Sequence, residues 1–229
     1  MFKFTAILAL ALTVASTQAS VNLPKVLIVG DSISLGYTSV LRSALQGKFS
    51  VTHACGEISG GRCNNGRSDI ILNKMKNYYA HGDVDVTTFN IGIHDMSVAP
   101  KAANSDLPCS AKPRMVPPTE YSQNLDTIFD FLAKHSRLVI WIDTTTLPAR
   151  MCAAESLDQY NKIAEEIARK HNFYVLHVDS TGHDKVGIHF TSQGYNNLGT
   201  QISRCILTAW AKASNRSCIA PASAKHESQ

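Results

Sequence analysis

The chain has 229 residues, of which 44% are hydrophobic and 17% charged, and its 22 Lys and Arg residues nearly balance 18 Asp and Glu residues. This composition is that of a folded globular protein and excludes a largely disordered chain. The basic residues are scattered along the sequence, which excludes a nucleic-acid-binding surface as the main feature of the protein.

The first 19 residues have the pattern of a secretory signal peptide. A short positive start is followed by an apolar run from Phe4 to Val14 and then by small residues. The run is shorter than the roughly 20 residues that a membrane-spanning helix needs. We therefore predict removal of 1–19, a single domain over 20–213 and a polar tail over 214–229. The predicted location is extracellular, or periplasmic in a Gram-negative host, without integral membrane association.

The rest of the chain alternates between apolar runs and amphipathic segments. Apolar, β-branched runs typical of strands buried on both faces cover 26–29, 86–93, 138–142 and 173–178. Apolar residues recur at helical spacing within 121–134, 157–171 and 196–211. This alternation predicts an α/β fold, a three-layer α/β/α domain around a central parallel sheet. We expect the stretch 99–118, rich in Pro, Ser and Lys, to be a long loop.

Six cysteines remain after the predicted signal peptide, and an even number in a secreted chain indicates disulfides. We favour the pairing of sequence neighbours, because it ties down loops without crossing the core. The predicted bridges are Cys55–Cys63, Cys109–Cys152 and Cys205–Cys218.

A metal site is the competing interpretation of the cysteines and histidines. No cysteine pair has CxxC spacing, and three histidines that are near one another in sequence lack the helical HExxH arrangement. These three are His177, His183 and His189. We therefore predict neither a metal nor another cofactor.

Gly30-Asp31-Ser32 follows the first predicted strand directly. The carboxyl ends of parallel strands are where α/β sheets bind ligands, so a serine there can expose its hydroxyl as a nucleophile. Its own backbone N–H can also point at a developing oxyanion. The alternative is an ordinary helix cap, for which Asp and Ser are equally suited.

Three later blocks contain Gly60 (in Glu57–Gly60), His94 (in Asn90–Asp95) and His189 (in Gly187–Thr191). In this order and spacing the chain resembles the SGNH (GDSL) hydrolase superfamily. The resemblance covers 26 to about 206 and points to a subgroup whose third block reads GxHD. A Thr-Thr-Thr-x-Pro stretch, present here as Thr144–Pro148, also fits that subgroup.

The resemblance implies a flavodoxin-like SGNH fold, with Ser32 as nucleophile and His189 as general base. The oxyanion would be bound by the backbone N–H groups of Ser32 and Gly60 and by a side chain of the third block. Most members have asparagine in that block. This chain has His94, whose ring N–H can donate the same bond in the right tautomer.

One position departs from the family pattern. Three residues before the histidine, where the family has the aspartate that orients the imidazole, this chain has Val186. Asp184 is close enough in sequence to substitute if the loop bulges, and a backbone carbonyl could instead leave a Ser–His dyad. The sequence thus leaves three alternatives: a triad completed by Asp184, a working dyad, or a slow or inactive enzyme.

By resemblance, we predict a secreted GDSL-type ester hydrolase (EC 3.1.1 type) that forms an acyl-Ser32 intermediate. The expected substrate is a small ester, an acetyl or short-acyl ester of carbohydrate. The alternatives are an acyltransferase, a lysophospholipase or lipase of the same fold, and a secreted binding or interaction protein. Val186 is the feature that favours the last of these.

Overall fold

A computed structural model describes residues 22–55, 66–178, 185–212 and 217–219. Its centre is a parallel six-stranded sheet in the order β2-β1-β3-β4-β5-β8. The strands are β1 (Lys25–Gly30), β2 (Ser50–His53), β3 (Val84–Asn90), β4 (Ser136–Ile142), β5 (Tyr174–His177) and β8 (Ser217–Ile219). The last strand lies within the segment expected to be a polar tail.

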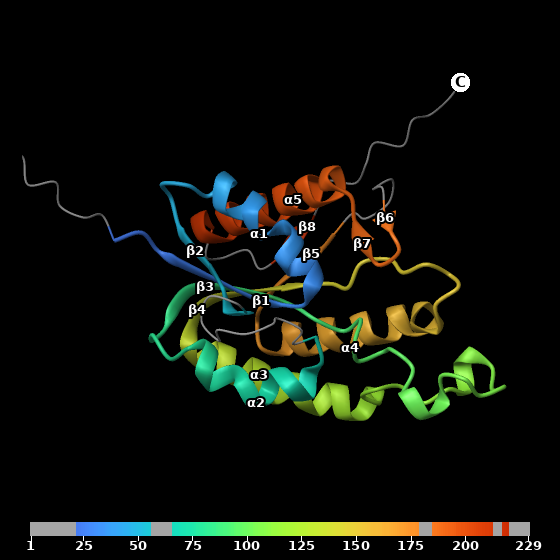
Figure 1. Ribbon diagram of the computed structural model, residues 1–229. Helices are drawn as coiled ribbons and strands as arrows, with labels where there is room; N and C mark the ends of the chain where they lie inside the picture. Colours follow the sequence, from blue (N-terminus) through green and yellow to red (C-terminus); the bar gives the residue numbers. More distant parts are fainter. Residues whose placement is uncertain (1–21, 56–65, 179–184, 213–216, 220–229) are drawn as a thin grey trace, which may run out of the picture.

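Helices cover both faces of the sheet and make three layers (Figure 1). One face carries α1 (Ser32–Ala44) and α5 (Ser192–Ala211), which pack against each other. The other carries α2 (Ser68–Tyr78), α3 (Pro118–His135) and α4 (Leu157–Lys170). This is the three-layer α/β/α arrangement predicted from the sequence.

Alternate residues of the central strands pack into two separate cores. Leu27 and Val29 of β1 point, with Trp141 of β4, into the core formed with α2, α3 and α4. Val26 and Ile28 point into the core formed with α1 and α5. Because both faces of the strands are covered, their sequences read as continuous apolar runs rather than as an alternating pattern.

The predicted helices are present, with boundaries that local chemistry shifts. Helix α3 begins at Pro118, because proline is well suited to the first turn, where its missing N–H costs no hydrogen bond. Helix α5 begins at Ser192, where the Thr191 hydroxyl caps the helix by accepting from the Gly194 N–H at 3.3 Å. Helix α2 lies outside the predicted helices.

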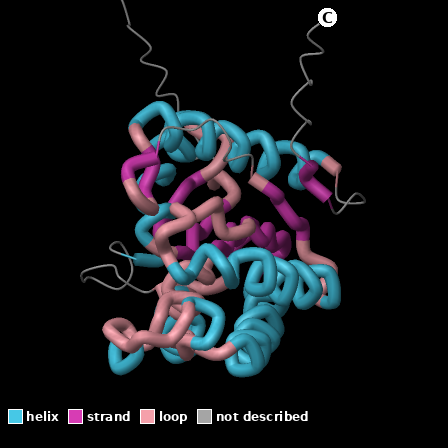
Figure 2. The backbone as a smooth tube through the Cα atoms, turned by 90° about the vertical axis from the view of Figure 1, so that its right-hand side faces the viewer, coloured by secondary structure: helices cyan, strands magenta, loops and turns pink. Residues whose placement is uncertain are grey.

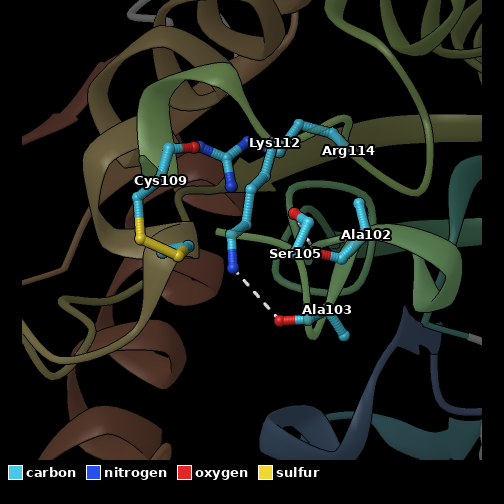
Figure 3. Close-up of a disulfide and its surroundings, with 7 residues drawn as sticks. Ala102, Ala103, Ser105, Cys109, Lys112 and Arg114 are labelled. Atoms are coloured by element: carbon cyan, nitrogen blue, oxygen red, sulfur yellow. Dashed lines mark hydrogen bonds between the residues drawn. A yellow bond between two sulfur atoms is a disulfide. The ribbon is translucent and has the colours of Figure 1, made fainter. Parts of the chain in front are cut away.

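The stretch predicted as a long loop is more ordered than expected (Figure 3). It contains two short 3-10 turns, Pro100–Ala102 and Cys109–Ala111, and its Arg114 forms an isolated antiparallel bridge with Val98, the residue just before the stretch. Lys112 donates to the Ala103 carbonyl across the loop at 3.1 Å.

Cys109 and Cys152 form a disulfide, the pairing favoured from the sequence, and it fixes this loop to the segment before α4. Cys55 and Cys205 are also disulfide-bonded. Their predicted partners, Cys63 and the Cys218 side chain, lie outside the described residues.

A two-stranded hairpin stands apart from the main sheet. It is formed by β6 (Lys185–Val186) and β7 (His189–Phe190), and it leads directly into α5. None of the helices within the described residues combines the length and the apolar character that crossing a bilayer requires.

Candidate active site

The polar residues of interest lie where strands end. Strands β1, β3 and β4 run in parallel, so their carboxyl ends meet at one edge of the sheet, and the β6–β7 hairpin lies beside that edge. Figure 2 looks toward it, with α1 and α5 above the strands and α2, α3 and α4 below. Ligands of open α/β sheets bind at this edge.

Ser32 occupies the first position of α1, directly after β1 ends at Gly30. A side chain at Gly30 would collide with the Asn90 amide oxygen and with Ser34, so only glycine allows the strand to turn into the helix here. The Asp31 carboxylate caps α1 by accepting from the Ile33 N–H at 2.9 Å. This local structure leaves Ser32 partly exposed.

His189 lies 157 residues further along the chain, yet its Nε2 is 2.9 Å from Ser32 Oγ. The hairpin explains this approach: Gly187 adopts φ +68° in the turn, a conformation that favours glycine, and returns the chain toward α1. The distance is that of a hydrogen bond between a nucleophile and its general base. The structure therefore brings together the two residues predicted to react.

His94 follows the end of β3, in a turn closed by a hydrogen bond from the Met96 N–H to the Gly92 carbonyl at 2.9 Å. The strand is shorter than predicted and ends at Asn90, because the backbone turns at Gly92, whose φ is +141°. The His94 Nε2 atom is buried and has no hydrogen-bond partner among the described residues.

The surroundings of His94 keep its ring neutral. Burial lowers the pKa of His94, and the neighbouring Arg67 and His189 side chains act in the same direction. A neutral ring with a proton on Nε2 offers one N–H donor, and that donor has no partner within the described part of the chain. His94 can thus donate to an oxygen that develops negative charge.

The remaining predicted site residues, Gly60 and Asp184, lie outside the described residues. Among the residues that are described, no group of three His, Cys, Asp or Glu side chains could hold a metal ion.

The structure also reveals a hydrogen-bonded network behind Ser32 that the sequence did not predict. The Tyr37 hydroxyl donates to the Asn90 amide oxygen at 2.7 Å, and the Asn90 amide nitrogen lies 3.4 Å from the Asp31 carboxylate. One feature of the sequence could have indicated a role for Asn90: it is a polar residue at the end of an apolar strand. These bonds fix the ends of β1 and β3 against α1.

A second Ser–His pair is buried below the first. Ser34 Oγ donates to the Asp31 carbonyl at 2.6 Å, so it must accept from His53 Nε2, which lies 2.7 Å away. His53 Nδ1 then accepts from the Cys55 N–H at 3.0 Å. Burial lowers the pKa of His53 to about 4, which keeps this pair neutral and structural. Nothing in the local sequence around His53 predicts the contact.

Asp31 makes the stability of the fold depend on pH. Burial raises the pKa of Asp31 from its ordinary value of 3.8 to about 6, against the opposing effect of its hydrogen bonds. The folded state therefore holds this proton more tightly than the unfolded state. Its contribution to the free energy of unfolding is largest below pH 4 and falls, by about 3 kcal/mol in total, as the pH rises to about 6.

We expect Asp31→Asn to remove this loss, since asparagine caps a helix as well as aspartate. Between pH 5 and pH 7.5 the free energy of unfolding of the variant should rise relative to that of the unmodified protein by roughly 1 kcal/mol. Urea unfolding at the two pH values measures the difference. Equal pH dependence of the two proteins would show that Asp31 does not carry this effect.

Comparison with known proteins identifies the type of fold. No protein-family model and no curated protein sequence matches the chain. Solved structures do: LAE5, an alpha/beta hydrolase from the metagenome of Lake Arreo in Spain, matches with a TM-score of 0.58 and 17% identity over 84% of this chain and 97% of its own. The chain has the fold of the SGNH hydrolases.

Two further structures share this SGNH fold. Axe2, an acetylxylan esterase from Geobacillus stearothermophilus, matches with a TM-score of 0.57 and 16% identity over 79% of this chain and 93% of its own. TesA matches with a TM-score of 0.55 and 16% identity over 83% of this chain and 98% of its own. At such low identity the likeness establishes the SGNH fold and not the activity.

Proposed function

We propose that this protein is a secreted serine esterase that works through an acyl-Ser32 intermediate. The observation that carries the proposal is the 2.9 Å contact between Ser32 Oγ and His189 Nε2 at the carboxyl edge of an SGNH-type sheet. A serine and a histidine so placed form the core of an acyl-transfer site. The resemblance of the sequence blocks to SGNH hydrolases supports the same conclusion.

In the proposed reaction, Ser32 Oγ attacks the ester carbonyl while its proton passes to His189 Nε2. The protonated His189 then gives this proton to the departing alcohol, which leaves the acyl group on Ser32. A water molecule, deprotonated by His189, attacks the acyl group and releases the acid. Serine and histidine return to their starting states, so no cofactor is consumed.

The proposed oxyanion hole has three donors. Ser32 stands at the first position of α1, where backbone N–H groups have no partner within the helix and the helix dipole favours negative charge. His94 would donate from its Nε2, which is buried and without a partner in the described part of the chain. The Gly60 N–H is proposed as the third donor on the basis of the sequence block alone.

For the orienting acid we propose Asp184. In the β6–β7 hairpin, Val186 pairs with His189 as its opposite residue. Asp184 stands two residues before Val186 in the sequence, and this short separation supports the proposal. For the substrate we propose an acetyl or short-acyl ester of carbohydrate, in line with the acetylxylan activity named for the structural neighbour Axe2.

Labelling with a fluorophosphonate probe tests the function directly. The probe forms a covalent bond only with an activated serine, so intact-mass analysis should find one adduct, located on Ser32, and Ser32→Ala should remain unlabelled. Acetate release from acetylated xylooligosaccharides, compared with octanoate release from an octanoyl ester, then tests the acyl preference. An unlabelled native protein, beside a fully labelled active esterase, would refute the esterase function.

A further inference from the structure

Helix α2 begins beside the turn that contains His94, which is closed by the Met96–Gly92 hydrogen bond. The start of the helix and this turn contact each other at two neighbouring places. Asp95 is fully buried, and its Oδ1 accepts from the Ser68 backbone N–H at 2.8 Å and from Ser68 Oγ at 2.6 Å. Ser68 is the first residue of α2, and the preceding Arg67 supplies no side-chain cap. Asp95, which is distant in sequence, thus caps the N-terminus of α2 in place of an N-cap side chain.

The second point of contact is between Gly66 and the His94 ring. A side chain at Gly66 would overlap the ring atoms Cδ2, Cγ and Nε2, so the imidazole lies directly on the glycine backbone. Gly66 precedes Ser68 by two residues, and His94 precedes Asp95 by one. The bond that anchors Ser68 to Asp95 therefore also fixes the surface on which the His94 ring rests.

A hydrogen bond from α3 also supports the contact between Ser68 and Asp95. Asn124 donates from its amide nitrogen to Ser68 Oγ at 3.0 Å, while the Ser68 hydroxyl donates to Asp95. Ser68 is fully buried, so none of its three bonds is exchanged with solvent. A buried, fully bonded contact of this kind holds a helix end in one position.

We propose that Asp95 is a positioning residue for the His94 oxyanion donor, acting through the start of α2 and Gly66. This inference rests on the proposed esterase function and goes beyond it, because it assigns a role to a residue that touches neither Ser32 nor the substrate. Oxyanion donors contribute to catalysis only when they are held in place before the reaction. A ring held on one side by Gly66 keeps its Nε2 in a single position.

A double-mutant cycle between Asp95 and His94 tests the proposal. In His94→Ala, we expect kcat for p-nitrophenyl acetate to fall by about 100-fold, the usual effect of losing one oxyanion donor. In Asp95→Ala, kcat should fall by about 10- to 100-fold with KM changed by no more than about threefold. In the double variant, the loss should equal that of His94→Ala alone, because Asp95 has no donor left to position.

Three variants serve as comparisons. Asp95→Asn keeps the oxygen that accepts both Ser68 bonds, and the other Asp95 oxygen has no hydrogen-bond partner among the described residues, so kcat should stay within about threefold. Tyr79→Phe removes a buried bond to Thr87 and a part-buried bond to Ser136, near the opposite edge of the sheet, and should leave kcat unchanged. Ser68→Ala removes the hydroxyl bonds to Asp95 and from Asn124 but keeps the backbone bond to Asp95. It should give a milder form of the Asp95→Ala effect, which is useful if Asp95→Ala fails to fold.

The outcomes separate this inference from the proposed function. If Ser32 is labelled by the fluorophosphonate probe but Asp95→Ala costs as much in the His94→Ala background as alone, Asp95 does not act through His94 and only the inference fails. The same holds if Asp95→Asn loses as much activity as Asp95→Ala. If native Ser32 is not labelled, the esterase function fails and the inference fails with it.

Discussion

Replacing His189 by alanine is expected to lower kcat for p-nitrophenyl acetate by about 10⁵-fold or more, which is the usual cost of losing the base of a serine hydrolase. The 2.9 Å contact with Ser32 is the reason, since without His189 no described group accepts the serine proton at that distance. Initial-rate measurements at saturating substrate give kcat for each variant. Ser32→Ala should cost a similar amount.

The double variant Ser32→Ala, His189→Ala should be no slower than either single variant, because the two residues act as one unit. His177→Ala is the matched control, since it removes a half-exposed histidine that pairs with Asp143. It should leave kcat within about twofold of the native value. A His189→Ala variant with near-native kcat, or a His177→Ala variant with the larger loss, would show that another histidine is the base.

Asp184→Asn is expected to produce the second largest loss, about 10⁴-fold in kcat, because an imidazole without its orienting carboxylate holds the wrong tautomer. The position that the resemblance to SGNH hydrolases assigns to this acid is occupied by Val186, which pairs with His189 across the hairpin. We therefore expect Val186→Asp to restore much of the lost activity in the Asp184→Asn background. Rates on p-nitrophenyl acetate, with the folded state checked by circular dichroism, measure both effects.

The same two variants distinguish the alternatives that the sequence left open. If Asp184→Asn retains native activity and Val186→Asp raises it, the native enzyme is a dyad limited by the absent acid. If neither substitution changes the rate, a backbone carbonyl already orients His189. In both cases the assignment of Asp184 would be wrong, while the roles of Ser32 and His189 would stand.

Much of the fold follows from local sequence. The apolar runs that became β1, β3, β4 and β5 were recognisable because a strand covered on both faces carries apolar side chains at successive positions. Helices α3, α4 and α5 were recognisable from apolar residues at helical spacing. Helix α2 was not predicted, although its Ile71, Met75 and Tyr78 also recur at helical spacing.

The sequence by itself predicted a three-layer fold from periodicity, and it named Ser32, His94 and His189 as candidates from short motifs that resemble those of SGNH hydrolases. The pairing of Ser32 with His189 was predicted from the family resemblance, whereas the other contacts, and the geometry of all of them, came from the tertiary structure alone. Ser32 and His189 are 157 residues apart, Ser68 and Asp95 are 27 apart, and Ser34 and His53 are 19 apart. Such contacts depend on how helices and strands pack in three dimensions, and no local pattern records that packing. For the same reason, the packing of the His94 ring against Gly66 could be identified only from the folded structure.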